Sequence, residues 1–436
     1  MRCLVRVAFI FPSIPTRNDK ETDLRRATVE KKDWLGQEAE SVAEALARRH
    51  PGSATSIHIF YPVDGHVMTD SGVEWFATRP MWPMTKRLFY MGKQWSNRFM
   101  TKLFDWKPDI VHWQMNSYPY TFHLAARRMV KADLPYVYQH HGPRLARKKH
   151  VLKVLQYPNR RADRGIYLTR YHEQQYREGL GLDAARSRIV RVGYDEKFRT
   201  LDRAACRRQT GFEGDPIIFW AAGINKRKDP ITVLRAYEKV AAEFPNSRFY
   251  MAGYGPLDDE VKNLVEGSPV LSRQVKLLGY VNNDDLPAME NAADIFIMGS
   301  HGEGFCVASM EAMACGLFPV LTTLPCFVEQ TDDGRLGLLF DPGDVEACAA
   351  HLRKAMGDVA YRERVRQDLP AAVAKLTWAY SANRLVDLYE EVLIERGRLP
   401  ESARTAAEDI DLSGVDIPLA LHDAPRPGVA GVPAGS

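Results

Sequence analysis

The sequence contains no apolar run that approaches the roughly 20 residues a transmembrane helix needs. Near the N-terminus the only continuous apolar run covers residues 7 to 11, and Pro12 ends it. A run this short is typical of a buried strand, whereas the apolar core of a signal peptide is longer. We therefore expect a cytoplasmic protein whose first element is a strand over residues 5 to 11.

Cysteine is scarce and widely spaced. No two cysteines form the CxxC pair that is typical of zinc or thiol redox sites, so a reduced protein is expected. The only Asp-x-Asp sequence, Asp409 and Asp411, lies close to the C-terminal end. The sequence therefore predicts no metal site and no bound cofactor. The six cysteines are Cys3, Cys206, Cys306, Cys315, Cys326 and Cys348.

A strong net charge is also absent. The formal net charge of +4 and the isoelectric point near 8.6 are too mild to indicate nucleic-acid binding, and they are compatible with an anionic substrate or surface. The chain has 436 residues, of which 45% are hydrophobic. That is enough for two cores of ordinary size, so we expect two domains.

The most informative stretch covers residues 294 to 323. Residues 295 to 298 form an apolar run that predicts a buried strand, and a loop containing Gly302 and Gly304 follows it. Residues 306 to 315 have helical spacing, and residues 318 to 321 predict the next strand. This order predicts one βαβ turn of a parallel sheet.

Two glutamates in this stretch are candidate binding residues. Glu303 lies in the loop and Glu311 near the middle of the helix, so both can face the carboxyl edge of the sheet, where ligands bind. The N–H groups of Phe305, Cys306 and Val307 open the helix and suit a phosphate. An exposed helix residue and a loop charge are the alternatives. The small apolar residues around Glu311 favour a site, since they argue against a solvated face.

The segment EGFCVASMEAMACG, residues 303 to 316, resembles the EGFxxxxxEAMAxG motif of the family 4 retaining glycosyltransferases, the glycogen synthase-like group. The resemblance implies the α/β GT-B fold, in which two Rossmann-like domains with parallel sheets face each other across a cleft. It also implies that Glu311 accepts hydrogen bonds from the ribose of a nucleotide sugar and that Glu303 holds the transferred sugar. Gly304 and the three residues after it would bind the donor.

The first half of the chain supplies a histidine. The sequence LPYVYQHHGPR predicts a strand that ends in His140 and His141, which places an imidazole at the ligand edge. It resembles the family element PVVxTxHG, which aligns His141 with the histidine that contacts the donor sugar; a structural histidine is the alternative. Earlier, residues 35 to 38 keep one glycine, Gly36, where family members usually carry two. Gly36 is therefore either a close-approach position for the donor or part of a helix start.

The loop AAGINKRKDP places Lys226, Arg227 and Lys228 at the mouth of a βα connection, where cations neutralise a diphosphate. An exposed basic loop is the alternative. Family members usually carry Gly-Arg early in this loop and a lysine late. Lys228 matches the lysine and Ile224 occupies the arginine position, so Lys226 is the candidate substitute. Gly223 would lie against the donor.

Further positions rest on the resemblance alone. The strand VKLLGYV corresponds to one whose backbone groups, around Tyr280 and Val281, contact the nucleotide base. Residues 322 to 344 resemble the element TxxGGxPExxxxGxxGLLxxPGD, with Pro-Cys in place of the two glycines. Glu329 keeps its place in this element, and a surface glutamate is an equally good interpretation.

We expect the chain to divide into domains near residue 192, because the segment VGYDEKF resembles the family hinge NGVDxxxF. Residues 1 to 192 would bind the acceptor and residues 193 to 377 the nucleotide sugar. An amphipathic helix over residues 378 to 398 would cross back to the first domain. Residues 399 to 436 are rich in Ala, Pro, Gly and Asp and predict a disordered tail.

Three stretches of the first domain have no assigned role. Residues 13 to 33 form a long polar insertion after the first strand. Residues 144 to 164 hold eight Lys or Arg against one Asp, which indicates a site for anionic lipid or an anionic acceptor, or else a solvated helix face. In the third stretch, residues 88 to 103, five apolar residues fall on one face of a predicted helix. That face either touches a membrane or an acceptor, or it packs on the sheet. That face comprises Leu88, Met91, Trp95, Phe99 and Leu103.

Together these features predict a retaining, metal-independent glycosyltransferase. It would move a sugar from a nucleotide sugar, with UDP or GDP as the expected carrier, to a hydroxyl of a glycan, lipid-linked or small-molecule acceptor. By the resemblance, Glu303, His141 and Lys228 would be catalytic. The alternatives are a GT-B isomerase or phosphorylase and a non-catalytic sugar-nucleotide-binding protein. The expected location is the cytoplasm, including the inner face of the membrane.

Overall fold

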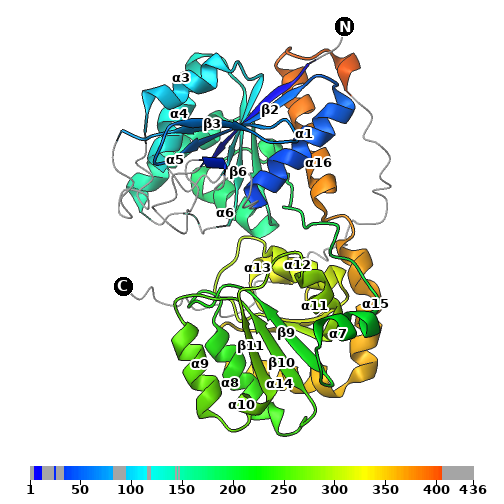
Figure 1. Ribbon diagram of the computed structural model, residues 1–436. Coiled ribbons are helices and arrows are strands. Elements are labelled where there is room, and N and C mark those ends of the chain that lie inside the picture. Colours follow the sequence, from blue (N-terminus) through cyan, green and yellow to red (C-terminus); the bar gives the residue numbers. More distant parts are fainter. Residues whose placement is uncertain are drawn as a thin grey trace.

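A computed structural model of the chain describes residues 4–11, 24–25, 34–81, 95–114, 119–142, 145 and 148–404. Two α/β units, each built on its own sheet, are stacked one above the other (Figure 1). This arrangement confirms the predicted fold class. Among the described residues, no helix combines the length and apolar character needed to span a bilayer.

The first unit contains an eight-stranded sheet in the order β3-β4-β2-β1-β5-β6-β7-β8. All of its pairs are parallel except β3 with β4, which form an antiparallel pair at the edge. The central strands are buried on both faces, as their continuous apolar runs predict. The strands are β1 (Arg6–Phe11), β2 (Ala54–Phe60), β3 (Gly65–Met68), β4 (Glu74–Thr78), β5 (Ile110–Gln114), β6 (Tyr136–His140), β7 (Arg164–Tyr167) and β8 (Ser187–Ile189).

Helices cover the two faces of this first sheet, so its apolar strands are shielded from water (Figure 1). These helices are α1 (Trp34–Arg49), α3 (Asn97–Asp105), α4 (Pro119–Lys131), α5 (Lys149–Arg161) and α6 (Arg170–Leu180).

The second unit contains a six-stranded parallel sheet in the order β11-β10-β9-β12-β13-β14. Its strands are β9 (Ile217–Ala221), β10 (Arg248–Ala252), β11 (Val275–Gly279), β12 (Ile295–Ile297), β13 (Phe318–Thr322) and β14 (Leu338–Phe340). Its helices are α7 (Arg203–Thr210), α8 (Pro230–Ala241), α9 (Asp258–Gly267), α10 (Leu271–Gln274), α11 (Leu286–Ala292), α12 (Val307–Ala314), α13 (Pro325–Gln330), α14 (Val345–Gly357) and α15 (Val359–Val373). The βαβ turn expected between residues 295 and 321 is β12-α12-β13.

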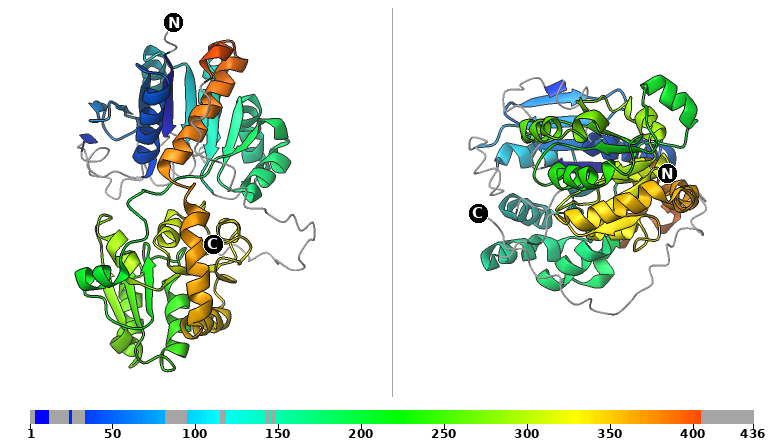
Figure 2. Two further views of the ribbon diagram at one scale, coloured as in Figure 1. Left: turned by 90° about the vertical axis from the view of Figure 1, so that its right-hand side faces the viewer. Right: turned by 90° about the horizontal axis from the view of Figure 1, so that it is seen from below.

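The last helix, α16 (Trp378–Glu395), returns from the second unit to the first (Figure 2). It packs on α1, and its buried residues include Leu385, Leu388 and Val392 from the predicted apolar face. Arg164 from the predicted basic stretch binds Glu391 of this helix at 2.7 Å. Arg164 therefore fastens the returning helix and does not contribute to an exposed basic patch.

The two chain crossings between the units run side by side. Tyr194 donates its N–H to Leu376 O at 2.9 Å, and Trp378 donates its N–H to Tyr194 O at 3.1 Å. Gly193 lies so close that a Cβ there would be 2.3 Å from the backbone nitrogen of Trp378. The hinge therefore requires glycine at position 193, because any side chain would push the two strands apart.

Some local expectations were wrong. The apolar helix predicted around residues 88 to 103 is α3, which begins only at Asn97, so Trp95 lies outside it; residues 82–94 lie outside the described residues. Phe99 and Leu103 are buried, so the described part of this face packs in the core. The predicted tail from residue 399 also starts too early, because Leu399 is buried and a short 3-10 helix covers Glu401–Ala403. Residues 405–436, and all of the 13–33 insertion except 24–25, lie outside the described residues.

Candidate functional site

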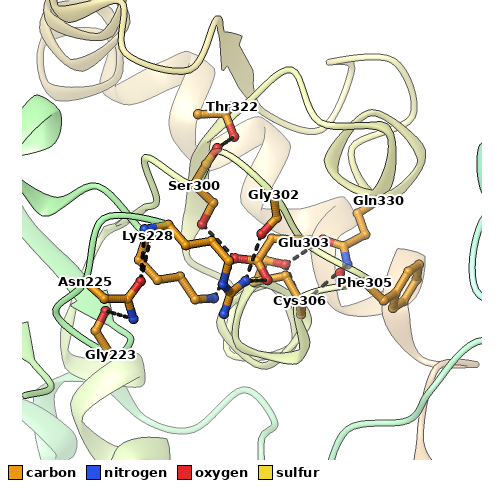
Figure 3. Close-up of polar contacts among 12 residues, drawn as sticks. Gly223, Asn225, Lys228, Ser300, Gly302, Glu303, Phe305, Cys306, Thr322 and Gln330 are labelled. Atoms are coloured by element: carbon orange, nitrogen blue, oxygen red, sulfur yellow. Dashed lines mark hydrogen bonds and ion pairs between the residues drawn. The ribbon is translucent and has the colours of Figure 1, made fainter. Parts of the chain in front are cut away.

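Glu303 lies at the centre of a polar cluster in the second unit (Figure 3). Its Oε1 is 2.7 Å from Nζ of Lys228, and its Oε2 is 2.8 Å from a guanidinium nitrogen of Arg227. Ser300 donates its hydroxyl to Oε1 at 2.8 Å. The side chains of Glu303 and Lys228 are only 6% and 11% exposed. Both charges are therefore largely removed from water and depend on each other.

The loop that carries these cations is shaped by Asn225. Its side-chain oxygen accepts hydrogen bonds from the N–H groups of Arg227 and Lys228, both at 3.1 Å. This turn places both side chains against Glu303. Lys226 is exposed, and within the described part of the chain its side chain has no hydrogen bond or ion pair. The second cation at Glu303 is thus Arg227. The role of Lys226 beside a diphosphate stays a prediction.

The electrostatics of the cluster keep Glu303 ionised. Burial by itself would raise the pKa of Glu303, but Lys228, Arg227 and the Ser300 hydroxyl together lower it below its ordinary value. One carboxylate between two cations leaves a net positive charge at this edge of the sheet. Such a cluster suits a ligand that carries a hydroxyl beside Glu303 and a negative charge beside the cations.

The start of α12 follows directly on this loop. Cys306, the N-cap residue, has a left-handed backbone with φ of 62°, and its own side chain makes no capping hydrogen bond. The turn is held from outside, because Gln330 donates to the carbonyl of Phe305 and its Oε1 lies 2.5 Å from the Ser309 hydroxyl. The first N–H groups, beginning with Val307, therefore stand at the positive end of the helix dipole.

Glu311 occupies a different environment on the same helix. Burial raises the pKa of Glu311 to about 7, Lys197 opposes this shift and Asp195 adds to it. The fully buried Glu290 lies near enough that Glu311 raises its pKa further. Glu311 is therefore a half-buried acid close to its titration point at neutral pH, well suited to accept hydrogen bonds from hydroxyl groups.

His141 is the histidine that meets the second unit. The carbonyl of His141 is so close to Gly304 that a Cβ on Gly304 would lie 2.2 Å from it. Burial lowers the pKa of His141 to about 3, and His112 contributes, so the ring is neutral. Its neighbour His140 is buried against the rings of His172 and Tyr176, which is a packing role.

The remaining predicted positions lie at the edges of the two sheets. Gly36 is buried in the first turn of α1. Gly223 follows β9, and Tyr280 and Val281 follow β11, so all three lie at the carboxyl edge of the second sheet. The Tyr280 side chain is 72% exposed and its ring centroid lies 5.9 Å from that of Tyr254. Tyr280 is thus open at this edge, and Gly223 and Val281 are half-buried.

Glu329, for which a surface role was left open, joins the two units. Its Oε1 accepts the backbone N–H of Arg170 at 2.8 Å, and its Oε2 lies 3.1 Å from the guanidinium of Arg191. Arg170 begins α6 of the first unit, whereas Glu329 lies in α13 of the second. Glu329 therefore holds the units together beside the start of α12.

Two family models match the chain. Residues 39–198 match the family described as Glycosyltransferase Family 4, and residues 202–369 match Glycosyl transferases group 1. The chain belongs to this glycosyltransferase family. The first matched range ends and the second begins near the hinge, so one family model covers each half of the GT-B fold.

Individual glycosyltransferases are similar to the chain over part of their length. Sulfoquinovosyl transferase SQD2 of Arabidopsis thaliana is 23% identical over 306 residues, which is 66% of this chain and 58% of that protein. O-antigen chain mannosyltransferase B of Escherichia coli is 31% identical over 167 residues, which is 38% of this chain and 43% of that protein. The chain thus spans about half the length of these curated relatives.

A solved structure shares the whole fold. The Anabaena protein HepE, crystallised in complex with UDP, superposes with a TM-score of 0.66 at 16% identity. The match covers 89% of this chain and 100% of that chain. At this level of identity the likeness concerns the GT-B fold.

The structure adds two residues that the sequence analysis did not name: Ser300 donates to Glu303, and Gln114 hydrogen-bonds His141. It also shows that Arg227, expected at the mouth of the loop, pairs with Glu303. Gln114 had a readable signal, since it is a polar residue at the end of an apolar strand. The sequence carried no signal for whether Arg227 or Lys226 pairs with Glu303, because this depends on the turn formed by Asn225.

Proposed function

We propose that the protein is a retaining glycosyltransferase that uses a nucleotide sugar and no metal ion. One observation carries the proposal: Glu303, ionised between Lys228 and Arg227, sits in the loop whose Gly304 touches His141 of the other unit. A sugar bound here meets a carboxylate on one side and a neutral imidazole on the other. That combination suits recognition of several hydroxyl groups at once.

The cations would act on the leaving group. When the bond between sugar and phosphate breaks, negative charge grows on the departing diphosphate, and a catalyst must stabilise that charge. Lys228, Arg227 and the first N–H groups of α12 supply positive charge at one place. With protein cations in this role, activity should survive treatment with EDTA.

The proposed stereochemistry follows from the same arrangement. If the acceptor hydroxyl attacks from the face that the diphosphate leaves, the departing phosphate oxygen can take the hydroxyl proton, and the anomeric configuration is retained. In this scheme Glu303 accepts hydrogen bonds from the sugar and does not attack it, because Lys228 and Arg227 already bind its two oxygens. Glu311 would hold the ribose.

The donor and the acceptor are proposed as classes. The structural neighbour HepE has been crystallised with UDP and with UDP-glucose, which supports a UDP-linked sugar; a GDP-linked sugar is the second choice. The acceptor would be a hydroxyl of a glycan, a lipid-linked sugar or a small molecule. Exposed Lys148, Lys149 and Lys153 at the start of α5 would attract an anionic acceptor or membrane surface.

The test is a transfer assay with UDP- and GDP-sugars and a panel of acceptors, with product configuration read by proton NMR. We expect product of retained configuration, turnover that persists in EDTA, and a loss of about 100-fold or more in Glu303→Ala and Glu311→Ala. An inverted product, or unchanged turnover in Glu311→Ala, would refute the proposal. Epimerised donor or phosphate-dependent cleavage without acceptor would indicate an isomerase or a phosphorylase. Binding without any turnover would indicate a sugar-nucleotide-binding protein.

A further inference from the structure

A buried polar network lies behind His141 at the carboxyl edge of the first sheet. It joins α1, β5 and β6 through three side chains that are at most 1% exposed: Glu38, Gln114 and Gln139. Gln114 Nε2 is 2.8 Å from Glu38 Oε2 and 3.1 Å from Gln139 Oε1. On its other side, Gln114 Oε1 hydrogen-bonds Nε2 of His141.

This network determines which way the amide of Gln114 points. A glutamine amide has an NH₂ group that only donates and an oxygen that only accepts. The ionised carboxylate of Glu38 only accepts hydrogen bonds, so the end of the amide that faces it is the NH₂ group, and Gln139 Oε1 accepts from the same group. The oxygen therefore faces His141, and the hydrogen bond between them requires a proton on Nε2 of the imidazole.

We propose that Glu38 is a positioning residue for His141, which it orients through the amide of Gln114. Glu38 Oε2 fixes the amide, the amide selects the Nε2–H tautomer, and the ring keeps Nδ1 as its hydrogen-bond acceptor. An unprotonated ring nitrogen is the kind of acceptor that suits a sugar hydroxyl. The inference rests on the proposed function for the role of His141, but the tautomer itself is a property of the protein alone.

The cost of burying Glu38 supports a role beyond packing. A buried carboxyl group without a cation is unfavourable, and among the described residues no Lys, Arg or His forms an ion pair with Glu38. Glu390 of α16 shows how a buried carboxylate is ordinarily stabilised: it is paired with Arg49 at 3.2 Å and with His50 at 2.7 Å. The carboxylate of Glu38 instead faces the amide of Gln114, and that amide also hydrogen-bonds His141.

The test compares variants by ¹⁵N NMR of the His141 ring and by transfer kinetics. In Glu38→Leu the amide of Gln114 loses one of the two acceptors that orient it, and in Gln114→Met the amide is gone. We expect the Nε2–H signature of His141 to give way to a mixture of tautomers in both variants. We also expect kcat to fall about five- to tenfold at nearly constant donor KM. Glu38→Gln retains an acceptor oxygen and should restore the tautomer and most of kcat.

His50→Leu is the matched control, because it removes a buried hydrogen bond to Glu390 just after the opposite end of α1. It should lower the melting temperature without changing the His141 spectrum or kcat. The inference is overturned if Glu38→Leu lowers the melting temperature as the control does while the His141 tautomer stays Nε2–H. If the wild type transfers no sugar at all, the proposed function fails, and the spectra still decide whether Glu38 sets the tautomer.

Discussion

Gly142 of the first unit and Gly304 of the second are in direct backbone contact: a Cβ on Gly142 would lie 2.0 Å from Cα of Gly304. Gly142 also has φ of 110°, in the left-handed region that side chains disfavour. The two residues directly follow His141 and Glu303, the candidate sugar-binding residues. The two units therefore meet in backbone contact at the place where the proposed chemistry occurs.

Adding a methyl group at this contact should prevent the units from closing. We expect Gly304→Ala to reduce transfer activity about 100-fold or more, because a 1 Å displacement of reacting groups is enough for such a loss. Small-angle X-ray scattering should show a larger radius of gyration with donor bound. Gly267→Ala is the control, since a Cβ there meets nothing within 4 Å and its activity should be unchanged. Normal activity in Gly304→Ala would mean that this contact is not used in turnover.

The two lysines of the 226–228 loop should differ sharply. Lys228→Met leaves Glu303 with one cation fewer and removes a positive charge that would stabilise the departing diphosphate. We therefore expect kcat to fall about 100- to 1000-fold. Lys226→Met removes an exposed side chain of similar length and should change kcat less than twofold. Steady-state kinetics with a UDP-sugar measure both. Equal losses in the two variants would show that Lys226 turns inward when the diphosphate binds.

Glu38 should make the protein less stable as pH rises. Burial raises the pKa of Glu38 to about 7, although Gln139 and Gln114 donate to it. Tyr389, His112 and His141 are further titratable groups around this network, and burial lowers the pKa of both histidines to about 3. A folded pKa above the unfolded value means that the stabilising effect is fully present below about pH 4.5 and is lost as pH rises through 7. The loss amounts to about 3 kcal/mol at most.

Urea denaturation at pH 5 and pH 8 measures this effect. Glu38→Gln has no carboxylate to ionise, so its advantage over the wild type should appear at pH 8 and be much smaller at pH 5. Glu44→Gln on the exposed face of α1 is the control and should change the free energy of unfolding by the same amount at pH 5 and at pH 8. An equal difference between Glu38→Gln and wild type at both pH values would show that Glu38 does not titrate in this range.

Removal of Glu329 should loosen the contact between the units. Glu329→Ala loses the ion pair with Arg191 and the hydrogen bond from the Arg170 N–H, which together contribute about 1 to 2 kcal/mol to closure. We expect a higher donor KM, an expanded scattering profile without ligand, and little change in melting temperature. Glu243→Ala breaks a similar pair with Arg353 inside the second unit and should leave KM unchanged. Identical behaviour of the two variants would argue against a role for Glu329 between the units.

Several parts of the site were predictable because they depend on residues close together in the chain. The run from 295 to 321 contains its own strand, loop, helix and strand, and it folds as β12-α12-β13. The alternation of apolar runs and polar strand ends likewise located the pair His140 and His141, and the resemblance to the family element selected His141. The β3-β4 pair was missed. β3 is a four-residue edge strand with a half-exposed face, which is too short for its apolar pattern to stand out, and β4, between β3 and β2, has only five residues.

The sequence by itself determined the family, the two parallel sheets and the identity of the two glutamates, because local apolar periodicity and a contiguous motif encode them. Only the tertiary structure decided that Arg227 pairs with Glu303, that Glu329 spans the units, and that Glu38 reaches His141 through Gln114. The physical reason is separation along the chain. Glu38 and Gln114 lie 76 positions apart. Which polar groups meet over such a distance depends on strand order and domain closure, and neither is written in any single stretch.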